Sequence, residues 1–294
     1  MLRRTIALVS VLLAVITAPQ TRAADRIDVI ATFSILADLV TNVGGDHVNV
    51  ITLVPVNGDA HVYAPTPADS KKLAAAKIVF TSGLGFEGWI TRLVKASGTK
   101  AAIVVTSKGV KARIDEDEHK TDPHAWQSIA NTKIYVANIR DALVQADPAG
   151  KDTYETNAKT YLAKLDALET DVKKAIDAIP RDRRKIITTH DAFGYFGAAY
   201  GMEFIAPQGV STDSEASARD VAKIITQIKK QKIPAVFLEN VTDDRLLKRI
   251  ADESGAKIGG KVFSDALSEP SGPAPTYIDM MRNNIKQFSI ALTS

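Results

Sequence analysis

The sequence of 294 residues contains no cysteine. Disulfides are therefore excluded, and the stability of the fold must come from a hydrophobic core and from any bound ligand. A lipid attached to an N-terminal cysteine is excluded for the same reason, so we expect a protein that is not lipidated. Hydrophobic residues make up 45% and charged residues 24% of the chain, which excludes the disordered and collagen-like classes. The length suits two domains of ordinary size.

Long hydrophobic runs are nearly absent as well. The exception is an apolar run over 6–18, which follows Arg3 and Arg4 and precedes a stretch of small residues. This pattern is typical of a secretory signal peptide, which we predict to span 1–23 with cleavage after Ala23. A membrane anchor is the alternative, but the run is shorter than the ~20 apolar residues that a spanning helix needs. We therefore expect a soluble protein of the periplasm.

The small excess of basic over acidic residues also disappears once the predicted signal peptide is removed. The whole chain has 37 basic and 34 acidic residues, and the predicted signal peptide holds three of the basic ones and no acidic one. The mature chain would then carry 34 residues of each sign. No basic patch with interleaved aromatic residues remains, so a nucleic-acid partner is not expected.

The first half of the chain alternates between strand and helix patterns. Strands are expected over 26–34, 48–54, 77–83 and 101–107, and helices over 35–45, 67–76 and 86–97. Thr66 is the expected N-cap of the helix over 67–76, with Pro67 in its first turn. Strands separated by helices favour parallel pairing, so residues 24–146 are predicted to form an N-terminal α/β lobe.

A long helix over 148–178 is predicted to follow. Its apolar residues recur at steps of three and four, and they are Tyr154, Ala158, Tyr161, Leu165, Leu168 and Val172. At 1.5 Å per residue the helix would reach roughly 45 Å, which exceeds one small domain. We interpret residues 147–179 as a rigid bridge between two lobes. A long packing helix inside one domain is the alternative.

The second half repeats the alternation of the first. Strands are expected over 185–190, 203–207, 234–240 and 256–264, and helices over 191–201, 215–231, 242–254 and 275–291. Residues 180–294 are therefore predicted to form a C-terminal α/β lobe. The predicted fold is α/β, with two Rossmann-like lobes joined by one long rigid helix.

Three of the five histidines and one aspartate lie at similar positions relative to the expected strands. His61, His124 and His190 each lie at or beyond the end of an expected strand or in a loop that enters a helix, and Asp265 follows the strand over 256–264. Ligands of open α/β sheets bind at the carboxyl ends of the strands. Three imidazoles and one carboxylate suit a divalent metal such as zinc. Hydrogen-bonded or exposed histidines are the alternative, because no two of the four residues are neighbours in sequence.

The loops that hold two of these histidines also hold prolines. Pro65 and Pro67 follow His61, and Pro123 directly precedes His124. Proline fixes φ and restricts the residue before it, so these loops should need little ordering when a ligand binds. Asp59 or a nearby carbonyl is expected to hold the far ring nitrogen of His61, and Trp126 is expected to shield the site from water.

At this point the chain resembles the zinc- and manganese-binding group of ABC-transporter substrate-binding proteins. The resemblance covers nearly the whole mature chain and rests on five motifs in order: LVPVNGDAHVYAPTPAD, TDPHAWQS, ITTHDAFGYFGAAYG, PAVFLEN and VFSDALSEPSGPAPTYIDMMRNN. It implies two lobes bridged by a single helix with the metal in the cleft between them. The family's four ligand positions fall on His61, His124, His190 and Asp265.

The chain departs from the family pattern in two places. The first motif usually reads Asp-Pro-His and then Tyr-Glu-Pro, whereas here it is Asp59-Ala60-His61 and then Tyr63-Ala64-Pro65. Zinc-specific members often have a long histidine-rich loop before the second ligand, but the loop over 112–122 holds only His119. A solvated acidic loop is the simpler interpretation, and a weak role in collecting metal is the alternative.

The predicted function is that of a periplasmic receptor. It would capture zinc and deliver it to an inner-membrane ABC permease. We expect a monomer, and a metallochaperone is a further candidate partner. The resemblance favours zinc, because manganese-dedicated members of the family tend to place glutamate where this chain has His190. Manganese is the alternative metal, because the same ligand set is permissive within that family. A zinc hydrolase is a rival of another class, but a closed four-ligand set leaves no position for water and no HExxH motif occurs. A surface adhesin is disfavoured by the missing cysteine.

Overall fold

The computed structural model describes residues 26–115 and 119–293. The predicted signal peptide (1–23) and the acidic residues 116–118 lie outside the described residues. Within the described ranges, none of the helices combines the length and the apolar character that crossing a membrane requires.

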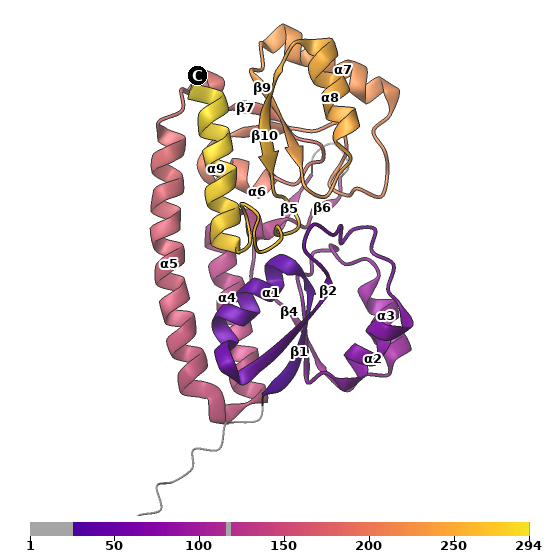
Figure 1. Cartoon of the computed structure of the whole chain (residues 1–294), viewed down its shortest axis with the longest axis vertical. Helices are drawn as coiled ribbons and strands as arrows, with labels where there is room; N and C mark the ends of the chain where they lie inside the picture. The colour runs from indigo at the N-terminus through magenta and orange to yellow at the C-terminus, as the bar shows by residue number, and fades with distance from the viewer. Residues whose placement is uncertain (1–25, 116–118, 294) are drawn as a thin grey trace, which may run out of the picture.

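Four parallel strands of the N-terminal half form the first sheet (Figure 1). They are β1 (Ile27–Phe33), β2 (Val48–Val54), β3 (Ile78–Thr81) and β4 (Ala102–Val105), in the order β2-β1-β3-β4. The connecting helices are α1 (Ser34–Gly44), α2 (Pro67–Ala75) and α3 (Ile90–Ser97). The last five residues of β1 are buried, as expected for a central strand covered on both faces.

The second sheet repeats this construction with the C-terminal half. Its parallel strands are β7 (Lys185–Ile187), β8 (Glu203–Ile205), β9 (Ala235–Glu239) and β10 (Lys257–Val262), in the order β10-β9-β7-β8. The helices are α6 (Gly194–Tyr200), α7 (Ala218–Gln231), α8 (Asp244–Ser254) and α9 (Tyr277–Thr293). Two parallel α/β sheets confirm the predicted fold class.

Two long helices and a short hairpin separate the sheets in the sequence. The hairpin pairs β5 (Arg113–Ile114) with β6 (Thr121–Asp122), and α4 (Ile129–Ala146) and α5 (Lys151–Asp177) follow. The helix α5 runs along both sheets (Figure 1), and at 27 residues it is about 40 Å long. It begins three residues later than predicted, after a 3₁₀ turn over 148–150. All six residues of its predicted apolar stripe are buried.

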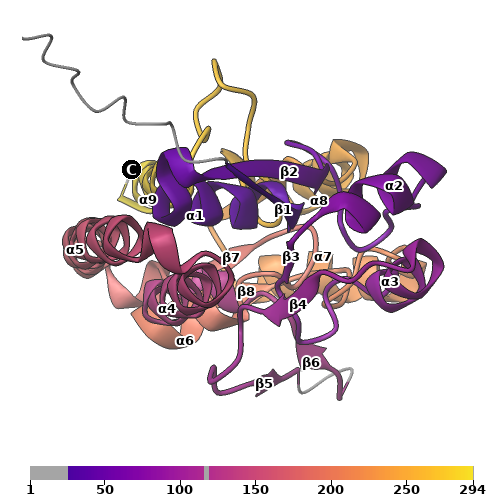
Figure 2. The same ribbon diagram turned by 90° about the horizontal axis from the view of Figure 1, so that it is seen from below.

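One hydrophobic core is continuous between the two sheets. It extends from Val29 in β1 to Leu292 in α9 and includes side chains of α4, α5 and the second sheet. The helix α9 lies beside α5, on the side of the molecule away from α3 (Figures 1 and 2). The lobe boundaries 24–146, 147–179 and 180–294 stay a prediction.

Several predicted elements are shorter than expected, and two of these differences lie near the candidate ligands. The helix predicted over 86–97 begins at Ile90, after a turn in which Gly83, Leu84 and Gly85 have positive φ values. The strand predicted over 185–190 ends at Ile187, and His190 then forms an isolated bridge with Gln208.

We expect metal binding to rotate the lobes little and to change mainly the loops over 115–127 and 208–217. The shared core and the unbroken helix α5 leave few residues that could absorb large φ/ψ changes. Crystal structures and solution scattering with and without metal would measure the rotation. A rotation approaching the ~15° of rigid-body allosteric transitions would contradict this expectation.

Candidate metal centre

The structure brings together the four residues singled out from the sequence. His61 lies in the loop after β2, His124 follows β6, and His190 and Asp265 each lie three residues after a strand of the second sheet. One nitrogen or oxygen atom from each of the four lies within 4.8 Å of the others. Residues far apart in the chain thus converge between the two sheets.

Asp265 is at the centre of this group. Its carboxylate oxygens lie 3.3 Å from Nε2 of His61, 3.5 Å from Nε2 of His124 and 3.1 Å from Nε2 of His190. Both oxygens are buried and lack a hydrogen-bond partner among the described residues. Buried polar atoms without partners are rare and costly, and a cation bound between the carboxylate and the three Nε2 atoms would satisfy them. The donor set of three nitrogens and one oxygen fits zinc.

A carboxylate on the far side of the ring orients His124. Oδ1 of Asp122 lies 2.9 Å from Nδ1 of His124 and accepts the backbone N–H of the same residue at 2.9 Å. Burial alone would lower the pKa of His124, but the charge of Asp265 and the contact with Asp122 outweigh it and raise the pKa to about 9. The ring therefore directs Nε2 toward the centre.

His190 has a similar partner, Glu239, at the end of β9. Oε2 of Glu239 lies 2.6 Å from Nδ1 of His190. The two atoms are not aligned for a hydrogen bond, so the contact is an ion pair. Burial would lower the pKa of His190, but the charges of Glu239 and Asp265 raise it well above its ordinary value. The same two histidines hold the pKa of Asp265 well below its ordinary value, against the effect of burial.

His61 is held differently from the other two histidines. Oδ1 of Asp59 accepts the backbone N–H of His61 at 2.9 Å, and Oδ2 accepts the hydroxyl of Thr212 from the second lobe at 2.6 Å. Asp59 therefore holds the backbone of His61 and a residue of the second lobe. The expectation that Asp59 or a nearby carbonyl holds the far ring nitrogen of His61 stays a prediction. Burial lowers the pKa of His61 despite the nearby charge of Asp265.

The position of Asp265 is fixed from the first lobe. The carbonyl of Ser264 accepts the indole N–H of Trp126 at 2.9 Å and the side-chain amide of Gln127 at 2.7 Å. Trp126 is fully buried, and its ring centroid lies 5.4 Å from that of His124. The segment that carries His124 thus also holds the residue before Asp265, so two of the four groups are positioned together.

The loop that carries His61 is fixed at both ends. The indole N–H of Trp89 donates to the carbonyl of Ala60 at 2.8 Å. Downstream, Thr66 and Asp69 form a capping box at the start of α2, with Pro67 at its first position, as predicted. The stiff proline segment therefore serves to anchor this loop to a helix.

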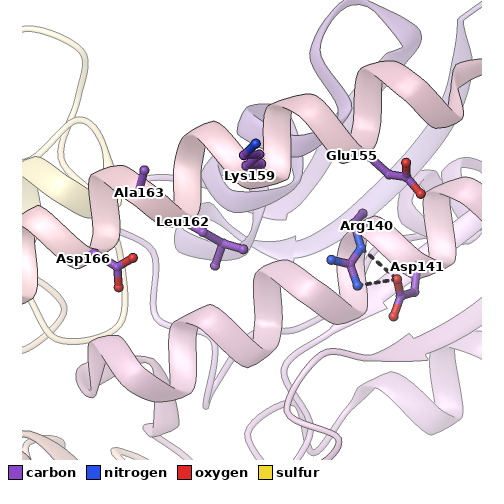
Figure 3. A pocket seen from close by; sticks show the side chains of 7 residues that line it. All are labelled: Arg140, Asp141, Glu155, Lys159, Leu162, Ala163 and Asp166. Atoms are coloured by element: carbon purple, nitrogen blue, oxygen red, sulfur yellow. Dashed lines mark hydrogen bonds and ion pairs between the residues drawn. The ribbon is translucent and has the colours of Figure 1, made fainter.

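Of two surface pockets of similar volume, only one borders the candidate metal site. A hollow of about 590 Å³ borders His61, Phe86 and Pro123 and would admit an ion from solvent. A larger hollow of about 630 Å³ lies between α4 and α5, where Arg140 pairs with Asp141 (Figure 3). Its charged side chains point along the helix surfaces and do not converge, so it offers no comparable ligand set.

Sequence reasoning missed Glu239 and Asp122. Both are buried acidic residues at strand ends, which is a signal that could have pointed to them. His119 is exposed and lies outside the cluster, as the interpretation of a solvated loop requires.

Comparisons with known proteins agree with this geometry. The family model described as "Zinc-uptake complex component A periplasmic" matches residues 29–291. The manganese-binding lipoprotein MntA of Halalkalibacterium halodurans is 32% identical over 92% of this chain and 89% of its own length. The iron ABC transporter substrate-binding lipoprotein MtsA of Streptococcus pyogenes is 34% identical over 94% of this chain and 92% of its own length.

A solved structure supports the same assignment. The periplasmic zinc-binding protein TroA from Treponema pallidum superposes with a TM-score of 0.87 and 30% identity, over 91% of this chain and 99% of that one. These relatives are receptors and not enzymes, which confirms the expectation that this chain is not an enzyme. The chain belongs to the family of periplasmic zinc-uptake component A proteins, the substrate-binding proteins of metal ABC importers.

Proposed function

We propose that this protein captures zinc and delivers it to its permease, with His61, His124, His190 and Asp265 as the ligands. The observation that carries the proposal is the pair of buried, unpartnered oxygens of Asp265, which three Nε2 atoms surround within 3.5 Å. Asp265 supplies one negative charge against the two of the ion, and the closed four-ligand set fits capture better than catalysis.

Zinc is favoured over manganese by the donor atoms. Imidazole nitrogens suit zinc, whereas manganese prefers oxygen ligands, and three of the four proposed ligands are nitrogens. Manganese is the alternative, since the relatives are named for manganese, iron and zinc. Titration of the metal-free protein with each metal in competition would test the assignment, together with elemental analysis of the protein purified from its own periplasm. A site that binds manganese more tightly than zinc would contradict it.

We expect His190→Glu to shift the preference of the site toward manganese. The substitution replaces a nitrogen donor by an oxygen donor at the proposed third ligand position. It also brings a carboxylate against Glu239, which disfavours the site for either metal. Because zinc also loses a nitrogen donor, we expect zinc affinity to fall more than manganese affinity. The ratio of the two dissociation constants is the readout, and an unchanged ratio would remove His190 as a determinant of selectivity.

For location we propose a soluble periplasmic protein that acts as a monomer. The apolar leader over 1–23 supports export, and the absence of cysteine from the sequence supports a form without a lipid, unlike the relatives that are named lipoproteins. The inner-membrane permease receives the metal, and a metallochaperone is a candidate second partner. Membrane fractionation would test the location, since protein retained by the membrane after salt washing would contradict it.

A further inference from the structure

His61 is the proposed ligand that lies nearest to solvent. Its side chain is 4% exposed, whereas the side chains of His124, His190 and Asp265 are fully buried. Of these four residues, all within the described ranges, His61 alone borders the hollow of about 590 Å³. An ion therefore enters and leaves the site beside His61, and we call this hollow the mouth of the site. The groups that hold the mouth shut decide how fast an ion can pass.

Both lobes contribute to the rim of the mouth. Phe86 belongs to the first lobe, whereas Ser211 and Asp213 belong to the loop over 208–217 of the second lobe. This loop connects the end of β8 to the start of α7. Because the rim is shared, the mouth widens whenever the loop moves away from the first lobe.

Thr212 joins this loop to the first lobe. Its hydroxyl donates to Oδ2 of Asp59 at 2.6 Å, while Oδ1 of the same carboxylate accepts the backbone N–H of His61 at 2.9 Å. A hydrogen bond to a carboxylate is stronger than one between neutral groups. Thr212 is flanked in the sequence by the two rim residues of the loop, so this bond holds that part of the rim against the segment that carries His61.

We infer that Thr212 and Asp59 form a latch that closes the mouth and sets the rate at which zinc enters and leaves. This inference rests on the proposed function of the cluster. While the latch is closed, the loop over 208–217 stays on the mouth, and an ion passes in either direction only after the latch has opened. A barrier that both directions share changes both rate constants by the same factor. It cancels from their ratio, so the latch governs the rates of exchange and leaves the dissociation constant unchanged.

Thr212→Val removes the latch and keeps the shape of the side chain. Valine cannot donate to Asp59, but Oδ1 of Asp59 still accepts the backbone N–H of His61, so the ligand stays in place. We expect the association and dissociation rate constants of zinc to rise together by about 10- to 100-fold, the range for the loss of a hydrogen bond to a charged group. The dissociation constant should change by less than about threefold, because the two effects cancel.

Two variants serve as matched controls. Thr212→Ser retains the hydroxyl and should retain the exchange rates of the wild type. Thr226→Val makes the same chemical change elsewhere in the second lobe, on the exposed face of α7, where the hydroxyl donates to the carbonyl of Ala222 in its own helix at 2.9 Å. It should leave both rate constants unchanged.

Asp59→Ala separates the latch from the positioning of the ligand. It removes the acceptor of Thr212 and also the acceptor of the backbone N–H of His61. We therefore expect it to speed zinc release, as Thr212→Val does, and in addition to weaken zinc affinity. If Thr212 merely supported the fold, Thr212→Val would lower the melting temperature and the zinc affinity together, without faster association.

The experiment measures zinc association by stopped-flow tryptophan fluorescence and zinc release by transfer to an excess of a chromogenic chelator. Trp126 is a suitable reporter, because its ring centroid lies 5.4 Å from that of His124. Backbone hydrogen exchange of the loop over 208–217 is measured in the metal-free wild type and variants. Parallel increases of both rate constants in Thr212→Val, with faster hydrogen exchange of the loop, would support the inference.

Two results would overturn the latch. One is a Thr212→Val variant with unchanged rates of exchange, and the other is faster release without faster association. A wild type that binds no zinc would instead refute the proposed function. Hydrogen exchange of the loop over 208–217 would then still decide whether Thr212 holds it against the first lobe.

Discussion

Replacement of His190 by alanine is expected to weaken zinc binding by two to three orders of magnitude. Four-ligand zinc sites are worth ~10–16 kcal/mol, so one ligand accounts for roughly 3–4 kcal/mol, and each ~1.4 kcal/mol is a factor of ten. His190 is fully buried and its Nε2 lies 3.1 Å from Asp265, so no other side chain can replace it without moving the backbone. Calorimetry with a competing chelator would measure the change and the stoichiometry, which we expect to be one zinc per chain.

The matched control for this measurement is His119→Ala. His119 is exposed on the loop before β6 and lies outside the cluster, so its loss should leave zinc affinity unchanged. If His190→Ala titrates like the wild type, the ligand assignment is wrong. If His119→Ala weakens binding instead, the loop over 112–122 takes part in metal capture.

Zinc affinity is expected to rise steeply with pH around neutrality. The nearby carboxylates raise the pKa of His124 to about 9 and that of His190 well above its ordinary value, so we expect each ring to keep a second proton near neutral pH in the metal-free protein. Zinc needs the Nε2 lone pair of each ring, so binding must displace those protons. A raised pKa therefore favours the metal-free form at low pH, and two displaced protons give up to about 100-fold in affinity per pH unit.

The number of displaced protons can be counted directly. Calorimetry at pH 7 in two buffers with different ionisation enthalpies should give about two protons released per zinc. With reference pKa values for the three histidines, zinc affinity would begin to fall only below about pH 6. The buried carboxylates raise the pKa of two of the three rings, so we expect the fall in affinity to begin at a higher pH. A zinc affinity that is independent of pH between about 6 and 8 would contradict competition between protons and zinc for the histidine nitrogens.

The pattern of the sequence predicted the fold class, and the placement of four residues, together with the family resemblance, indicated the candidate ligands. The alternation of strand and helix patterns predicts parallel sheets, and parallel sheets place His190 and Asp265 at the same edge. The apolar stripe of α5 was visible because a helix that packs along its whole length repeats every three to four residues. These features depend on local periodicity, which the sequence carries directly.

The residues around the ligands could not be predicted in the same way. Glu239 contacts His190 because β9 pairs beside β7, and sheet order leaves no trace in local periodicity. Asp59 turned out to hold a backbone N–H and Thr212, because the loop over 208–217 reaches across from the second lobe. The early end of the strand at Ile187 depends on tertiary contacts of the same kind.

The core that extends from Val29 to Leu292 has a consequence for how the molecule folds. Part of that core forms only when α9, the last helix of the chain, has packed against β10 and α5. A second cluster, with Ile187, Ile228 and Leu247, lies between the second sheet and the helices α7 and α8. We therefore expect the two lobes to unfold together, and a chain shortened at its C-terminus to expose the part of the core that α9 covers.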